Sequence, residues 1–307
     1  TPAAVGINHR VSIMIGNQAG NVWPAAAGNA TGSACASGLC YLPPVLTSIS
    51  GPGSAAADTV GGHLVVITGR HFGPITFPTA TIDYVYYGPS PGPFSTQYSG
   101  KQCSVTAQTP TVSQITCVTD QGVGRNLTWV VSIGGQAATN AGAPLVSSYA
   151  APQVFIFSGA GATDADTDGG EPVVITGRNF GPADTYTNNL MSVNYGVVLQ
   201  EGGPAFLSVI PFVRYIAASC GITVAHTELT CYTRPGAGRA MDWKVTIDSQ
   251  ASANPTTSYH PPRIDTITHL DGVTPFSGAN AADVDGGQSV YLNGDYFGPV
   301  TYGNTSK

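Results

Sequence analysis

Short apolar runs, mostly of β-branched residues, alternate with Gly- and Pro-rich segments along the whole chain. The run Val-Val-Ile-Thr-Gly-Arg occurs at 65–70 and again at 173–178, and Phe-Gly-Pro follows one residue later in both places. A looser copy with the same Gly and Phe-Gly-Pro occupies 290–299. Because β-branched residues resist helix and pack well in sheets, each run predicts a buried strand that ends in a turn. Three copies of one phrase indicate an internal repeat.

Two further segments of each repeat are strand-like. Residues 81–88 and 190–196 both end in Tyr-Gly. Residues 129–133 and 243–247 both begin with Trp, and alternation places Trp, Val and Ile of each run on one face, toward a core. Gly or Pro interrupts every stretch in which a helical period could be sought, so we expect no helix. About seven short strands in roughly a hundred residues predict an all-β, immunoglobulin-like sandwich.

A Pro-rich joint opens each unit, at Pro43-Pro44, Pro152 and Pro261-Pro262. The unit resembles the IPT/TIG family in its Pro-x-Ile/Val start, its Gly-Gly…Val-x-Ile-x-Gly-x-x-Phe-Gly core, its Cys pair and its late Val-x-Ile-x-x-Gln. The resemblance implies tandem immunoglobulin-like sandwiches, and it says little about function because this family hosts receptors, adhesins, enzyme accessory modules and surface fibres. The expected division is an N-terminal strand with a Cys-containing loop (1–43), sandwich 1 (44–150), sandwich 2 (151–261) and an incomplete third unit (262–307).

Six cysteines fall as three close pairs: Cys35 with Cys40, Cys103 with Cys117, and Cys220 with Cys231. No Cys-x-x-Cys pair or His partner stands at the spacing of a zinc site. Each cysteine is therefore predicted to form a disulfide with its near neighbour, which implies an oxidising, extracellular setting. The chain begins at Thr1 rather than Met, so we also expect a processed protein that has lost a signal peptide.

Three Asn-x-Ser/Thr sequons, at Asn29, Asn126 and Asn304, predict N-linked glycans if the source is eukaryotic. Asn29 lies in a long polar loop. Asn126 follows a Gly-rich turn and aligns with Ala240 of the second repeat, so the fold does not demand it.

Candidate chemistry is sparse. The net charge of −6 and the lack of a Lys/Arg cluster argue against nucleic acid as a partner, and no apolar run has the length of a membrane span. Gly88-Pro-Ser-Pro-Gly92 matches a hydrolase nucleophile pattern, but its prolines forbid the strand-to-helix turn that this motif needs. Asp164, Asp166 and Asp168 could supply oxygen ligands to Ca²⁺. Only Asp166 recurs in the other units, as Asp58 and Asp283, which favours turn capping and predicts no cofactor.

The two ends of the sequence contain parts of further units. Residues 11–19 align with the closing strands 129–137 and 243–251, whereas 262–307 align with the opening strands of a unit. We therefore expect Val11, Ile13 and Ile15 of one copy to complete the unit begun by 262–307 of the next, giving a head-to-tail homopolymer. The predicted function is a non-enzymatic, secreted and glycosylated extracellular filament or surface appendage. Two alternatives stay open, namely the ectodomain of an adhesin or receptor and an accessory region of a larger secreted enzyme.

Overall fold

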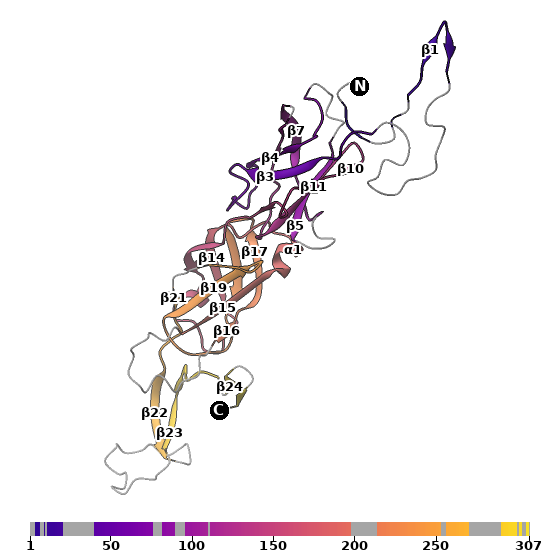
Figure 1. The fold of residues 1–307 in the computed structure, drawn as a ribbon. Coiled ribbons are helices and arrows are strands. Elements are labelled where there is room, and N and C mark those ends of the chain that lie inside the picture. Colours follow the sequence, from indigo (N-terminus) through magenta and orange to yellow (C-terminus); the bar gives the residue numbers. More distant parts are fainter. Residues whose placement is uncertain are drawn as a thin grey trace. The chain divides into compact units, whose positions relative to one another are not determined.

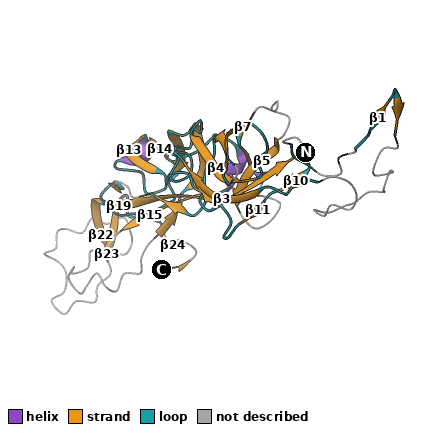
Figure 2. Ribbon diagram, turned by 45° about the horizontal axis from the view of Figure 1, so that its top comes forward, coloured by secondary structure: helices purple, strands orange, loops and turns teal. Residues whose placement is uncertain are grey.

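The computed structural model describes residues 4–6, 9, 11–20, 40–75, 82–89, 96–109, 111–197, 214–252, 256–269, 290–299, 301–302 and 305–306. Strands account for nearly all of its regular structure (Figures 1 and 2). The chain divides into two compact units, one of Thr1–Ala151 with Asp248–Gln250 and the other of Pro152–Ile247 with Ala251–Lys307. Each unit contains one complete β-sandwich and is described by itself.

Sandwich 1 consists of two facing sheets. The first has the strand order β11-β3-β4-β8-β7, and the second has the order β10-β9-β5-β6, with β12 also paired to β9. All of these neighbours run antiparallel except β11, which pairs in parallel with β3. The strands are β3 (Val45–Ser50), β4 (Leu64–Arg70), β5 (Ile82–Pro89), β6 (Tyr98–Ser99), β7 (Lys101–Gln108), β8 (Ser113–Val118), β9 (Leu127–Ile133), β10 (Gln136–Ala137), β11 (Thr139–Asn140) and β12 (Val146–Ser147).

Sandwich 2 repeats this arrangement. Its sheets have the orders β13-β14-β18-β17 and β16-β15-β19-β20, with β21 also paired to β19. The repeated run forms β4 in one sandwich and β14 in the other, and the two strands show the same alternation of buried and more exposed positions. The strands are β13 (Gln153–Ser158), β14 (Pro172–Arg178), β15 (Met191–Val197), β16 (Arg214–Ile216), β17 (Ala218–Val224), β18 (Glu228–Tyr232), β19 (Met241–Ile247), β20 (Gln250–Ala251) and β21 (Thr256–Thr257).

The core of each sandwich lies between its two sheets. Trp129, Val131 and Ile133 are buried on the inner face of β9, as the alternation of the sequence predicts. The ring of Trp129 stacks on Tyr87 from β5 with centroids 4.3 Å apart, and Trp243 stacks on Tyr195 at the same distance. The predicted closing strands and their buried faces are therefore confirmed in both sandwiches.

The glycine of the repeated phrase is required by close packing. A Cβ on Gly69 would collide with the Val45 carbonyl oxygen and with the ring of Phe72, which is fully buried. Gly177 stands in the same relation to Gln153 and Phe180. In this phrase the phenylalanine that follows the strand packs its buried ring against the glycine inside the strand.

Short helical segments in the described chain depart from the expectation of no helix. A 3₁₀ helix spans Ala160–Ala162, and α1 spans Thr185–Asn189. The side chain of Asp184 caps α1 by accepting a hydrogen bond from the backbone N–H of Thr187. A helix of five residues is too short to show a hydrophobic period, so the cap is its only signal in the sequence.

Small two-stranded sheets occur at both ends of the described chain. β1 (Met14–Ile15) pairs with β2 (Gln18–Ala19), β22 (Arg263–His269) pairs with β23 (Val290–Asp295), and β24 (Thr301–Tyr302) pairs with β25 (Thr305–Ser306). All three pairs are antiparallel.

Candidate functional site

Among the described residues of the third unit, the hairpin β22–β23 reproduces the opening strands of a sandwich. Arg263 pairs with Asp295 and Ile264 with Gly294, as Val45 pairs with Arg70 and Leu46 with Gly69 in sandwich 1. The side chains that align with core residues are nevertheless exposed. Val290, Leu292 and Phe297 are 50%, 47% and 44% exposed, whereas their equivalents in both complete sandwiches are 0% exposed. We call the face formed by Ile264, Val290, Leu292 and Phe297 the open core face.

The hairpin β1–β2 is the matching fragment of a closing strand. Met14 pairs with Ala19 and Ile15 with Gln18, which is the register of β9 with β10. Ile13 and Ile15 are 62% and 76% exposed, whereas the aligned Val131 and Ile133 are 2% and 0% exposed. Val11, which aligns with the buried Trp129, is 44% exposed. The residues predicted to act in assembly therefore carry a core-type apolar pattern that the described part of this chain does not bury.

The layers of sandwich 1 fix how two such fragments could meet. The strand equivalent to β1 is β9, which lies in the sheet opposite β3 and β4. A closing hairpin therefore packs across the core from the opening strands and does not hydrogen-bond beside them. Only the segment after it returns to the first sheet, since β11 pairs in parallel with the start of β3. If residues 11–19 of one copy complete the unit begun by 262–307 of the next, they would therefore pack face to face on its opening strands, and a short parallel pairing would follow.

The cysteines of the two complete sandwiches form the predicted disulfides. Cys103 bonds to Cys117 across the β7–β8 hairpin, and Cys220 bonds to Cys231 across β17–β18. Cys117 and Cys231 lie buried on the strand next to β4 or β14. Cys40 is also disulfide-bonded, and its predicted partner Cys35 lies outside the described residues.

The three aspartates considered for Ca²⁺ are not gathered into a metal site. Asp166 accepts a hydrogen bond through Oδ1 from the N–H of Asp168, and Asp58 accepts the equivalent bond from Val60. Both aspartates cap the same turn, as predicted. Asp164 and Asp168 align with Ala56 and Val60 of sandwich 1. Within the described ranges, no three His, Cys, Asp or Glu side chains cluster as a metal ion would require. Asp283 lies outside those ranges.

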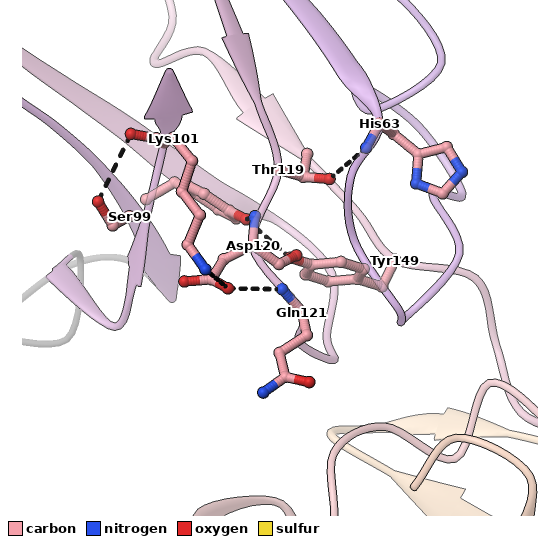
Figure 3. Close-up of polar contacts among 9 residues, drawn as sticks. His63, Ser99, Lys101, Thr119, Asp120, Gln121 and Tyr149 are labelled. Carbon is pink, nitrogen blue, oxygen red and sulfur yellow. Dashed lines mark hydrogen bonds and ion pairs between the residues drawn. The ribbon is translucent and has the colours of Figure 1, made fainter. Parts of the chain in front are cut away.

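A buried tyrosine pair closes one end of each sandwich. In sandwich 1, Tyr87 and Tyr149 share a hydroxyl–hydroxyl bond of 2.7 Å. Tyr149 donates to the carbonyl of Asp120, whose N–H donates to Tyr87 (Figure 3). Sandwich 2 has the same network with Tyr195, Tyr259 and the backbone of Arg234. The tyrosines bond only to backbone atoms of Asp120 in sandwich 1 and of Arg234 in sandwich 2. The network therefore forms with either side chain at this position.

Burial of these tyrosines changes their ionisation. Burial raises the pKa of Tyr87 to about 12, although hydrogen bonds from Tyr149 and the Asp120 backbone oppose the rise. Burial also raises the pKa of Tyr149, Tyr195 and Tyr259. These hydroxyls therefore stay protonated at neutral pH. A separate ion pair lies nearby on the surface of sandwich 1. The Nζ of Lys101 is 2.6 Å from Oδ1 of Asp120 (Figure 3).

One of the three predicted glycosylation sites lies in the described chain. Asn126 is exposed and has a φ of 57° in the turn before β9. Ala240 takes nearly the same conformation, with a φ of 54°, before β19. The turn therefore forms with either residue, and the side chain of Asn126 remains accessible. Asn29 and Asn304 lie outside the described residues.

A family model decides the identity of the first sandwich. The model of the IPT/TIG domain matches residues 44–146, the stretch that contains β3 to β12. Residues 44–146 are an IPT/TIG domain. The resemblance read from the repeated phrase is thereby confirmed for sandwich 1, and the strand order shows that sandwich 2 has the same immunoglobulin-like architecture. None of the curated proteins matches the chain. In the part of the chain that the structure describes, no helix is long and apolar enough to cross a membrane.

Several solved structures resemble the chain at low identity. SGBP-B, from a xyloglucan utilization locus of Bacteroides uniformis, is 14% identical with a TM-score of 0.25, over 75% of this chain and 57% of that one. The Yersinia pseudotuberculosis adhesin InvE is 13% identical with a TM-score of 0.35, over 70% of this chain and 58% of that one. The extracellular region of plexin A4 is 14% identical with a TM-score of 0.25, over 71% and 18%. The chain therefore spans less than two thirds of each of these structures.

Proposed function

We propose that this IPT/TIG protein is a non-enzymatic structural subunit of a secreted, glycosylated extracellular filament or surface appendage. In this proposal, the β1–β2 hairpin of one copy packs on the open core face of the next. One observation supports it most directly. The hairpins β1–β2 and β22–β23 correspond to the closing and the opening strands of a sandwich, and both expose side chains that are buried in the complete sandwiches. The disulfides of the two sandwiches support an oxidising, extracellular location.

The chemistry of the two fragments fits such a contact. Full burial of an Ile, Leu or Phe side chain is worth about 1.5–3 kcal/mol, and each fragment exposes several of them. An apolar face exposed to water tends to associate with another apolar surface. Binding to a partner with apolar side chains at corresponding positions is therefore favoured. The interface would join different surfaces of identical chains. Such heterologous contacts need not close, and they extend into open filaments.

The test uses two half-blocked variants of the full chain. I13D/I15D removes the apolar side chains of the hairpin, and V290D/L292D removes those of the open core face. We expect the unmodified chain to form end-to-end polymers by electron microscopy and light scattering, and each variant alone to stay monomeric. Mixing the two variants should restore one intact interface and give dimers, because each variant retains the surface that the other lacks.

Met14→Ser and Tyr291→Ser serve as matched controls. Both lie on the same strands but align with Ser132 and Val66, which do not face the core. Polymers should form in both controls. If the unmodified chain stays monomeric, or if I13D/I15D polymerises as it does, the assembly proposal is wrong. The open core face would then be covered by a neighbouring repeat of a longer chain, as in an adhesin or receptor ectodomain.

A further inference from the structure

An aromatic pair lies on the outer face of sandwich 1. Tyr84 and Tyr86 stand two residues apart on β5, so their side chains share one face of the sheet. Their rings stack with centroids 5.1 Å apart and planes 20° apart. Tyr84 is 39% exposed, and Tyr86 is half-buried. Their cross-strand partners on β9 are Ser132 and Val130. This face therefore presents a stacked aromatic surface to its surroundings.

The fold itself does not require this pair. In sandwich 2 the equivalent positions on β15 are Ser192 and Asn194. Their cross-strand partners on β19 are Thr246 and Lys244. The same sheet is built with polar side chains there, and both versions form the same strand pairs. The tyrosines are thus a surface feature that only sandwich 1 carries.

Sandwich 1 also carries the described sequon, and sandwich 2 lacks it. Asn126 is exposed, and Ala240 replaces it in the second repeat at nearly the same φ. A glycosylation sequon and a tyrosine pair therefore occur together in sandwich 1, and sandwich 2 has neither.

The strand register places the two features on one surface. Thr128, the third residue of the sequon, pairs with Gly88, and Val130 pairs with Tyr86. Thr128 is thus the diagonal neighbour of Tyr86, a separation of about 7–8 Å in an antiparallel pair. Asn126 stands four residues before Val130, the cross-strand partner of Tyr86, so it is at most about 13 Å from the level of Tyr86. The first few sugars of an N-linked glycan can cover that distance. No side chain stands at Gly88 to obstruct the path.

We propose that an N-linked glycan on Asn126 lies across Tyr84 and Tyr86 and covers this face of the IPT/TIG domain. One face of a pyranose ring presents C–H groups, and these pack favourably on the electronegative faces of aromatic rings. The inference rests on the glycosylation in the proposed function and not on filament assembly.

The test measures the rate at which the glycan is enzymatically released from the folded protein. The unmodified full chain and matched variants are secreted by a eukaryotic host for this comparison. Y84S/Y86N introduces the residues of sandwich 2 and leaves the sequon intact. We expect peptide N-glycosidase to release the Asn126 glycan about fivefold more slowly from the unmodified chain than from this variant, the factor expected for one aromatic contact. Glycan removal should also lower the melting temperature of the unmodified chain and leave that of Y84S/Y86N unchanged.

Two controls make the result specific. Tyr232→Ser removes an equally exposed tyrosine, 40% exposed on sandwich 2, and should leave the release rate unchanged. Tyr84→Ser alone removes only the more exposed ring and should give an intermediate rate. An unoccupied Asn126 by mass spectrometry, or equal release from the unmodified chain and Y84S/Y86N, overturns the inference. None of these variants alters β1–β2 or β22–β23, so assembly of the same samples reports separately on the filament proposal.

Discussion

At the scale of single residues, the repeated phrase records one packing contact. Gly69 and Gly177 are fixed by a ring above them and a carbonyl beside them, so the phrase keeps its glycine and phenylalanine together. In the third copy, a Cβ on Gly294 would likewise collide with the Arg263 carbonyl. The same close approach of glycine and carbonyl therefore occurs in the described strands of the third unit.

Gly69→Ala should destabilise sandwich 1 by about 1–3 kcal/mol, because the added methyl must displace either a backbone carbonyl or the buried Phe72 ring. Urea unfolding of the variant measures this. Gly142→Ala is the control in the same unit, since a Cβ there meets nothing within 4 Å and its φ is not positive. Equal midpoints for the two variants would contradict the packing account.

The buried tyrosines predict a loss of stability at alkaline pH. The unfolded chain ionises tyrosine near pH 10, whereas Tyr87 in the fold has a pKa of about 12. The unfolded state therefore releases its proton first, so stability is full below pH 10 and falls as the pH rises toward 12. The slope is about 1.4 kcal/mol per pH unit for each such tyrosine. Urea midpoints between pH 9 and 11.5 measure it, and Tyr87→Phe should give a shallower slope than the unmodified chain.

At the scale of elements, the strands were the part of the fold that could best be predicted from the sequence. The β-branched run, the Trp-led closing strand and the Cys hairpin were all predictable, because each has a two-residue period or a local partner. The pairing of the Cys hairpin beside β4 was not, since it depends on contacts between distant residues. Nor did the sequence reveal the stacked pair of Tyr84 and Tyr86 as a surface, because tyrosine in a strand is equally typical of the core.

Removing the β7–β8 disulfide should weaken sandwich 1 specifically. The Cys103–Cys117 bond closes a loop with a sequence separation of 14 residues, for which the chain-entropy model gives about 3 kcal/mol. C103S/C117S should therefore lose roughly that much free energy of unfolding. The C220S/C231S variant provides the comparison, because its loss should appear in the unfolding of sandwich 2. A C103S/C117S chain that unfolds at the unmodified midpoint would show that the hairpin does not need its bond.

At the scale of the whole molecule, the chain has few charged residues and exposes apolar side chains on β1–β2 and β22–β23. Only 9% of residues are charged and the net charge is −6, so long-range repulsion between copies is weak at physiological ionic strength. The residues at the two ends that align with core positions are apolar. Contacts between copies should then follow the rules of hydrophobic burial rather than those of ion pairing.

Assembly should accordingly persist in 1 M sodium chloride and strengthen in sulfate, which favours burial of apolar surface. Light scattering across a salt series measures this directly. The variant D295N, which removes the exposed partner of Arg263 at the edge of the open core face, should assemble as the unmodified chain does. Dissolution of the polymers by sodium chloride alone would point to a polar interface instead.

The parallel pairing of β11 with β3 has a mechanical consequence. The N–H of Thr139 donates to the Pro44 carbonyl and that of Ala141 donates to the Leu46 carbonyl, so the first and one of the last strands of the domain are joined directly. A pull on the chain at Pro44 and Ala141, on either side of this pairing, draws the parallel neighbours past each other. The hydrogen bonds are then loaded in shear and must break together, whereas an antiparallel hairpin pulled from its open end unzips one bond at a time. We therefore expect the resistance of sandwich 1 to force applied across this pairing to exceed what its equilibrium stability alone would suggest.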